Sequence, residues 1–101
     1  MKVNGDYKNS IGELRIELDE IDYQIIKLLI SRFSITKQIG KIKQDLAIEV
    51  IDQNREDEII ARIRNVINEE DEDDTCVTNI NSITKIYKEI MSESRKQQKN
   101  L

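Results

Sequence analysis

Four side chains in this sequence are suited to bind a small anion. Arg32 and Lys43 are eleven residues apart, which is three helical turns, so on one helix they share a face with about 16 Å between their Cα atoms. Two side chains at that separation leave a gap the size of a small dianion. Ser94 and Gln98, four residues apart near the C-terminus, are polar positions on an otherwise apolar stripe. Cations beside neutral donors are groups that bind carboxylates.

Each of these residues also has an ordinary structural explanation. A buried arginine such as Arg32 can fix the register of a helix contact, and Lys43 can lie on a solvated flank. Ser94 and Gln98 can belong to a fraying helix end. Taken singly, the four positions leave these explanations open.

A long helix must position Arg32 and Lys43. Between residues 11 and 46 there is no proline, and apolar residues recur at alternating steps of three and four, as on one face of a helix. Arg32 occupies the one position of this seam that should be apolar, so it needs an anion or water beside it. The seam consists of Ile11, Leu14, Leu18, Ile21, Ile25, Leu28, Ile35, Ile39, Ile42 and Leu46.

The length of this helix predicts the assembly. Its 36 residues, at roughly 1.5 Å each, form a rod of some 50 Å, whereas a compact chain of 100 residues has a radius of gyration of only about 13 Å. The residues that follow cannot cover such a rod. We therefore expect an all-α fold with three helices per chain, in which two copies bury their seams in an intertwined homodimer.

Local signals place the ends of the first helix. The polar residues 1–9 predict a flexible arm, and Ser10 followed by Glu13 is a capping box that predicts a start near Ile11. The helix should end near Leu46 or Ala47, and residues 10–101 should form one helical domain. Gly40 inside the helix costs roughly 1 kcal/mol relative to alanine. It is either a tolerated glycine, a helix contact, or a place where another group approaches the backbone.

Two further helices follow. Asp52 predicts the N-cap of a second helix that runs to about Asn68. The acidic run 69–74 predicts a loop, because six adjacent like charges repel, and it lacks the alternation and the glycine of an EF-hand. A third helix should begin between Thr75 and Asn79. The inward residues are expected to be Ile59, Ile60, Ile63, Val66 and Ile67 on the second helix, and Ile80, Ile83, Tyr87, Ile90 and Met91 on the third.

Composition excludes several classes of function. The chain has 101 residues and a net charge of −4, without a basic stripe interleaved with aromatics, so we expect no nucleic-acid partner. Outside the acidic run, 16 basic residues outnumber the remaining acids by two. Cys76 is alone and histidine is absent, which argues against a disulfide framework, a zinc site and cysteine catalysis. The N-terminus lacks an apolar signal core, and no run approaches a membrane span, so we expect a cytoplasmic protein.

Taken together, these residues resemble the all-α chorismate mutase family from about Ile11 to Gln98. No single part of the pattern is specific, but the order and spacing over nearly the whole chain are. The pattern comprises Leu14-Arg15, Leu18-Asp19-Glu20-Ile21-Asp22, Leu28-Leu29 with Arg32, Ile39-Gly40-Lys41-Ile42-Lys43, Asp52-Gln53-Asn54-Arg55-Glu56, and Ser94 with Gln98.

The resemblance implies a helical homodimer with two pockets, each built from both protomers. It implies a [3,3] rearrangement of chorismate to prephenate without a cofactor or metal, in phenylalanine and tyrosine biosynthesis. It further implies that Arg15 reaches into the partner's pocket, while Arg32, Arg55 and Ser94 bind the substrate carboxylates. We expect a stand-alone mutase without a fused domain or an allosteric module.

The resemblance also implies roles at the reacting bond. Lys43 and Gln98 would donate hydrogen bonds to the ether oxygen, with Lys43 also touching a carboxylate, while Glu56 and the Asp52 region hold the ring hydroxyl. A pericyclic step needs a pocket that selects the compact conformer and meets developing charge. Gln98 does not titrate, so little pH dependence is expected from it.

The chain departs from the family pattern in two places, and two alternative functions stay open. The acidic run lengthens the connection between the second and third helices, and Gln98 lies three residues from the end, which could leave it mobile. An isochorismate-pyruvate lyase shares the fold and a related chemistry. A non-enzymatic helical dimer, acting as an adaptor, explains the seam and the capping box equally well but not the matching polar residues.

Overall fold

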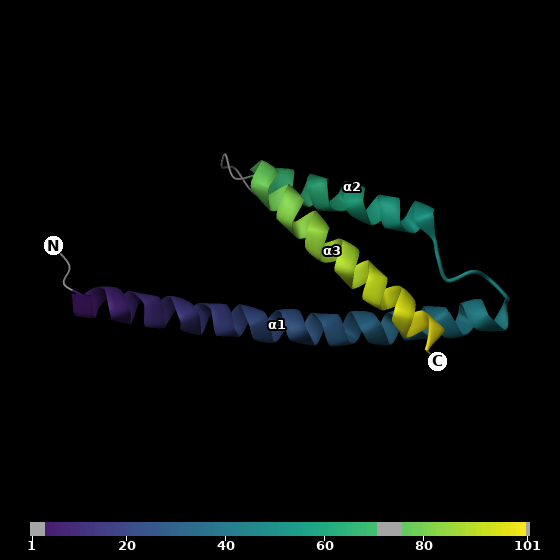
Figure 1. The fold of residues 1–101 in the computed structure, drawn as a ribbon, viewed down its shortest axis with the longest axis horizontal. Helices are drawn as coiled ribbons and strands as arrows, with labels where there is room; N and C mark the ends of the chain where they lie inside the picture. Colours follow the sequence, from purple (N-terminus) through teal and green to yellow (C-terminus); the bar gives the residue numbers. More distant parts are fainter. Residues whose placement is uncertain (1–3, 71–75, 101) are drawn as a thin grey trace. The chain divides into compact units, whose positions relative to one another are not determined.

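The chain is all-α, as predicted. The computed structural model describes residues 4–70 and 76–100, and helices account for most of them (Figure 1). They are α1 (Asn4–Asp45), α2 (Gln53–Glu70) and α3 (Cys76–Lys99). The chain divides into two compact units, residues 1–34 and 35–101. The first unit consists of the N-terminal part of α1, and the second contains the end of α1 together with α2 and α3.

The apolar seam of α1 is exposed within the single chain. In the first unit, Leu14 is 57% exposed and Leu28 is 68% exposed, and in the second unit Ile42 is 56% exposed. The same holds for the other seam residues, Ile11, Leu18, Ile21, Ile25, Ile35, Ile39 and Leu46. The homodimer stays a prediction.

The start of α1 corrects the sequence analysis. The helix begins at Asn4, six residues before Ser10, so the capping box at Ser10 does not mark its N-terminus. A capping signal stabilises a helix end where one occurs, but adding a residue to an existing helix forms one more backbone hydrogen bond. The segment 4–9 contains no proline to stop that extension. The flexibility of the N-terminal arm stays a prediction.

The end of α1 lies at Asp45, next to the predicted Leu46. Ala47 has a φ of 54°, which is the left-handed conformation that glycine usually supplies after a helix. The Ile48 N–H donates to the Lys43 carbonyl at 2.8 Å, and the Ala47 N–H donates to the Gln44 carbonyl at 3.2 Å. These two bonds form a Schellman motif, which satisfies carbonyls at the helix end. The stop signal in the sequence is weak because alanine takes the place of glycine.

Asp52 caps α2 as predicted. Its Oδ1 accepts a hydrogen bond from the Arg55 N–H at 3.0 Å, and its carbonyl accepts the N–H of Glu56 at 3.1 Å. The helix continues to Glu70, two residues beyond the predicted end, so Glu69 and Glu70 are helical rather than part of a loop. The rest of the acidic run lies outside the described residues.

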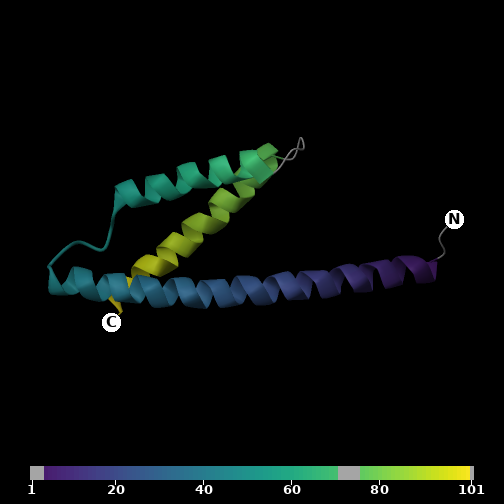
Figure 2. The same ribbon diagram turned by 180° about the vertical axis from the view of Figure 1, so that it is seen from behind.

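The core of the second unit lies between α2 and α3. These helices run in opposite directions and contact each other (Figures 1 and 2). Ile63, Ile67 and Met91 are buried, with at most 7% of each residue exposed. Val66 was predicted to face inward but is 48% exposed, because the contact with α3 is narrow. The other predicted inward residues are at least half-buried: Ile59, Ile60, Ile80, Ile83, Tyr87 and Ile90.

Among the described residues, no helix combines the length and the apolar character needed to cross a membrane.

Candidate active site

Gly40 lets the end of α3 approach α1 closely. Gly40 is buried, and a Cβ atom added to it would lie 2.8 Å from Cα of Gln98 and 2.9 Å from both Cβ and the carbonyl oxygen of Gln98. No side chain larger than hydrogen fits at these distances without a shift of α3. The helix contact considered for Gly40 is therefore present, and the group in contact is Gln98 itself.

The face of α1 that turns to α3 is not the apolar seam. Thr36 and Gly40 are buried and Lys43 is half-buried, and their spacing of four and three residues places them on one side of the helix. In the same stretch, the seam residue Ile42 is exposed. Thr36 was not predicted to lie at this contact, although a small polar residue four positions before the interior glycine was a usable signal.

Gln98 presents a buried polar group at this contact. Its Oε1 atom is buried and makes no hydrogen bond within the described residues. Leaving such an acceptor unpaired costs about 1–3 kcal/mol, and such atoms are uncommon in folded proteins. Rotating the amide by half a turn would place the NH₂ group there instead, because the two ends of a glutamine amide have the same shape. The site can therefore accept or donate one further hydrogen bond.

Lys43 and Ser94 are oriented by backbone carbonyls. The Lys43 Nζ donates to the carbonyl of Val50 at 2.8 Å, in the segment between α1 and α2. Ser94, which is 5% exposed, donates its hydroxyl to the carbonyl of Ile90 at 2.7 Å. Both side chains are therefore held near the protein backbone rather than extended into solvent.

Arg55 lies at the surface in this structure. Its Nη1 pairs with Oε2 of Glu58 at 3.2 Å, and both side chains are more than half exposed. An ion pair of this exposure contributes little to stability, so Arg55 can exchange Glu58 for another carboxylate at small cost.

Glu56 is paired with a residue that sequence analysis missed. Nη1 of Arg95, on α3, lies 2.5 Å from Oε2 of Glu56, in the first turn of α2. Arg95 follows Ser94 directly and precedes Gln98 by three residues. A cation between two predicted site residues was the available signal, but its partner is 39 positions away in sequence and could not be identified.

Three of the predicted residues of the second unit, Lys43, Asp52 and Glu56, line two hollows, whereas Arg55, Ser94 and Gln98 line neither. Glu56, Met91 and Arg95 line a cavity of about 800 Å³ between α2 and α3. Lys43 and Asp52 line a smaller cavity of about 250 Å³ at the start of α2. Gln53 lines both, so the two hollows are neighbours. The structure thus groups Lys43 with Asp52, and Glu56 with Arg95.

Arg15 and Arg32 belong to the first unit. Arg15 is exposed and Arg32 is half-buried. Their placement beside Lys43 and the residues of α3 stays a prediction, as does the entry of Arg15 into a partner's pocket.

Comparison with known proteins adds a match over most of the chain. The family model described as chorismate mutase type II matches residues 14–99. The chain belongs to the type II chorismate mutase family. The matched range includes every predicted site residue, from Arg15 to Gln98.

A curated relative agrees with this family. The chorismate mutase of Methanocaldococcus jannaschii is 39% identical to this chain over 64 residues. The match covers 63% of this chain and 65% of the relative, so the chain matches just under two thirds of that protein's length. A comparison with solved structures found no match.

The contact at Gly40 generates a prediction. Gly40→Ala should lower the free energy of unfolding by about 1–3 kcal/mol, because the new Cβ forces the end of α3 away from α1. Urea denaturation at fixed protein concentration measures the loss. Amide hydrogen exchange should show reduced protection in the last turn of α3.

Gly12→Ala is the matched control. A Cβ at Gly12 meets nothing within 4 Å, so this substitution should be neutral or raise stability by up to about 1 kcal/mol through helix propensity. Equal stability of the two variants would contradict the close contact between Gly40 and Gln98.

Proposed function

We propose that this protein is a chorismate mutase, which rearranges chorismate to prephenate without a cofactor. The observation that carries the proposal is the packing of Gln98 on Gly40, which leaves the buried Oε1 of Gln98 without a hydrogen bond within the described residues. Gly40 lies three residues before Lys43 on the same face of α1. This arrangement suits a pocket that offers two hydrogen-bond donors to one oxygen atom.

The reaction needs little chemistry from the protein. In a [3,3] rearrangement one carbon–oxygen bond breaks while one carbon–carbon bond forms, so no proton transfer or nucleophile is required. Negative charge develops on the ether oxygen as its bond to carbon lengthens. An ammonium and an amide N–H fixed near that oxygen stabilise the transition state more than the ground state. Lys43 and Gln98 have these roles in the proposal.

The same proposal assigns groups to the rest of the substrate. Arg32, Arg55 and Ser94 bind its two carboxylates, together with Lys43. Bidentate contacts from a planar guanidinium hold a carboxylate in a defined orientation. Such contacts keep the chain-like part of chorismate folded over its ring, which is the conformer that reacts.

The ring hydroxyl is the remaining polar group of the substrate. Glu56 accepts its hydrogen bond in this proposal, while Asp52 shapes the neighbouring hollow and keeps its own carboxylate on the start of α2. The N-cap bond from the Arg55 N–H holds one oxygen of Asp52 at the start of α2.

We also propose that two chains form the active protein. In a monomer the seam of α1 would remain a long exposed apolar stripe, and a second copy of the same helix buries it. Each Å² of apolar surface that the pairing buries contributes about 25 cal/mol of favourable free energy. Arg15 then enters the pocket of the other protomer.

The reaction itself is the first test. Purified protein should consume chorismate, followed by its ultraviolet absorbance, and acid should convert the product to phenylpyruvate, which identifies prephenate. Lys43→Ala should lower kcat by at least about a hundredfold, because it removes a charged donor at the ether oxygen. Lys41→Ala is the matched control, since Lys41 forms only an exposed pair with Asp45 at 3.5 Å. Absence of turnover by the wild-type protein would sink the proposal, and pyruvate released from isochorismate would replace it with a lyase.

A second prediction concerns the donor at Gln98. A carboxylate cannot donate a hydrogen bond unless it is protonated. Gln98→Glu should therefore lose about two orders of magnitude in kcat at neutral pH and recover activity as the pH falls toward about 4 to 5. The wild-type rate should vary little over the same range.

Gln97→Glu controls for the added charge. Gln97 is the half-buried residue next to Gln98, and its replacement by glutamate introduces the same carboxylate one position earlier. Its pH profile should follow the wild type. Near-normal activity of Gln98→Glu at neutral pH would remove Gln98 from the mechanism.

The shared pocket predicts complementation between inactive variants. Arg15→Ala and Lys43→Ala each impair every pocket of their own homodimer. After mixing and exchange of subunits, half of the dimers are mixed, and one of their two pockets contains both native residues. The mixture should recover about a quarter of wild-type activity. No recovery, with subunit exchange verified by mass spectrometry, would show that Arg15 acts within its own chain.

A further inference from the structure

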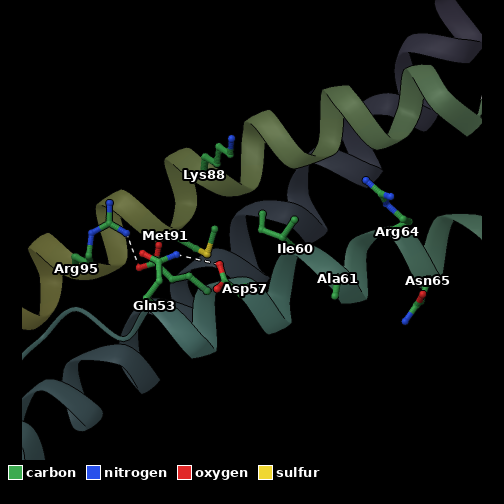
Figure 3. A pocket seen from close by; sticks show the side chains of 10 residues that line it. Gln53, Asp57, Ile60, Ala61, Arg64, Asn65, Lys88, Met91 and Arg95 are labelled. Carbon is green, nitrogen blue, oxygen red and sulfur yellow. Dashed lines mark hydrogen bonds and ion pairs between the residues drawn. The ribbon is translucent and has the colours of Figure 1, made fainter.

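Arg95 connects two segments that are far apart in the sequence. It lies on α3, between Ser94 and Gln98, and its guanidinium pairs with Glu56 at the start of α2. In the close-up, Arg95 and Met91 lie on α3 facing Gln53 and Asp57 on α2 (Figure 3). The pair thus joins the two helices at the end of the second unit where Gln98 meets α1.

The neighbouring carboxylate does not compete for Arg95. Asp57 Oδ1 accepts a hydrogen bond from Gln53 Nε2 at 2.9 Å, so Asp57 is held within its own helix. The other ion pairs of α2 and α3 that the structure describes, Arg55 with Glu58 and Lys96 with Glu93, join residues three positions apart. A further pair, Lys41 with Asp45, lies within α1. Of these four ion pairs in the described residues, only Arg95 with Glu56 joins two helices.

The exposure of the pair indicates what it contributes. The side chains of Arg95 and Glu56 are 31% and 22% exposed, so water screens their attraction. Pairs of this kind add little to stability. A glutamate side chain, however, has three rotatable bonds, and a short charge-assisted hydrogen bond restricts them to one arrangement. The main effect of Arg95 is therefore on the orientation of Glu56.

The orientation leaves one oxygen of Glu56 for a ligand. Arg95 engages Oε2, so Oε1 can accept a hydrogen bond from a hydroxyl group. Arg95 and Gln98 are three residues apart on α3, and Gln98 is fixed by its contact with Gly40. The same helical turn that positions the donor Gln98 thus positions the acceptor Glu56.

We infer that Arg95 is a positioning residue, which holds the Glu56 carboxylate so that its second oxygen binds the hydroxyl of the substrate ring. The inference rests on the proposed function and extends it, because Arg95 touches no reacting atom and acts only through Glu56. A hydroxyl that keeps its hydrogen bond throughout the reaction contributes to binding of ground state and transition state alike. Loss of Arg95 should therefore raise KM more than it lowers kcat.

The experiment measures kcat and KM for chorismate in Arg95→Ala, Arg95→Lys and the matched control Lys96→Ala. Lys96 is the next residue on α3 and pairs with Glu93 at 3.1 Å on the surface. Arg95→Ala should raise KM about tenfold, which corresponds to one hydrogen bond to a charged group, with kcat within about twofold. Arg95→Lys should restore most of the affinity, and Lys96→Ala should behave as the wild type.

A double variant separates positioning from a purely structural role. If Arg95 acts through Glu56, then Arg95→Ala should cause no further rise of KM in a Glu56→Gln background. Urea denaturation should place Arg95→Ala and Lys96→Ala at similar stability. A tenfold effect that persists in the Glu56→Gln background, or an unchanged KM in Arg95→Ala, would overturn the inference. In either case the wild-type turnover still stands as the test of the mutase, and a wild-type protein that forms no prephenate overturns both.

Discussion

The approach of Gln98 to Gly40 is the contact on which the candidate site depends. Helix α3 leaves its partner α2 toward its C-terminal end, and the absence of a side chain at Gly40 is what lets its backbone reach α1 (Figures 1 and 2). The apolar stripe of α3 ends in the same place, where Ser94 follows Met91 and Gln98 follows Ser94. The last turn of a helix normally frays, because its last carbonyls lack partners. Packing against Gly40 gives this end a fixed position, as the proposed role of Gln98 as a donor requires.

The polar groups of the second unit are arranged with little help from buried charge pairs. Lys43 is oriented by a backbone carbonyl, Asp52 by the start of its helix, and Arg55 by a weak surface pair. Such partners can be exchanged for a dianionic ligand at small cost, whereas a fully buried ion pair would resist exchange. Glu56 differs, since it is held by Arg95 from another helix. The difference fits the proposed role of Glu56 as an acceptor that must keep one orientation.

Helix α1 has two faces with different uses. Its small and polar residues, Thr36 and Gly40, are buried in the second unit, while its long apolar seam stays exposed within the single chain. A surface of that kind is uncommon on a soluble monomer. The exposed seam is the basis of the proposed homodimer, in which Arg15 would enter the partner's pocket. The same helix would then hold two chains together and carry residues of both pockets.

Sequence alone determined the elements, because helix periodicity and caps are local properties. The three helices, the N-cap at Asp52, and the inward stripe of α3 through Met91 all follow from residue types at helical spacing. The family resemblance added the proposed site residues, which periodicity alone left open. Local signals failed where another option cost little: the start at Asn4, the alanine in the left-handed turn at Ala47, and the helical Glu69 and Glu70.

Tertiary structure decided which residues meet. Nothing in the sequence pairs Arg95 with Glu56, because a contact across 39 residues depends on how α2 and α3 fold back on each other. Gly40 left a close approach to the backbone as one of three explanations, and nothing in the sequence indicated that Gln98 makes the contact. Val66 lies on the apolar side of α2 by periodicity, yet a single neighbouring helix is too narrow to cover it. Periodicity fixes a face of a helix, and only packing decides how much of that face is buried and against what.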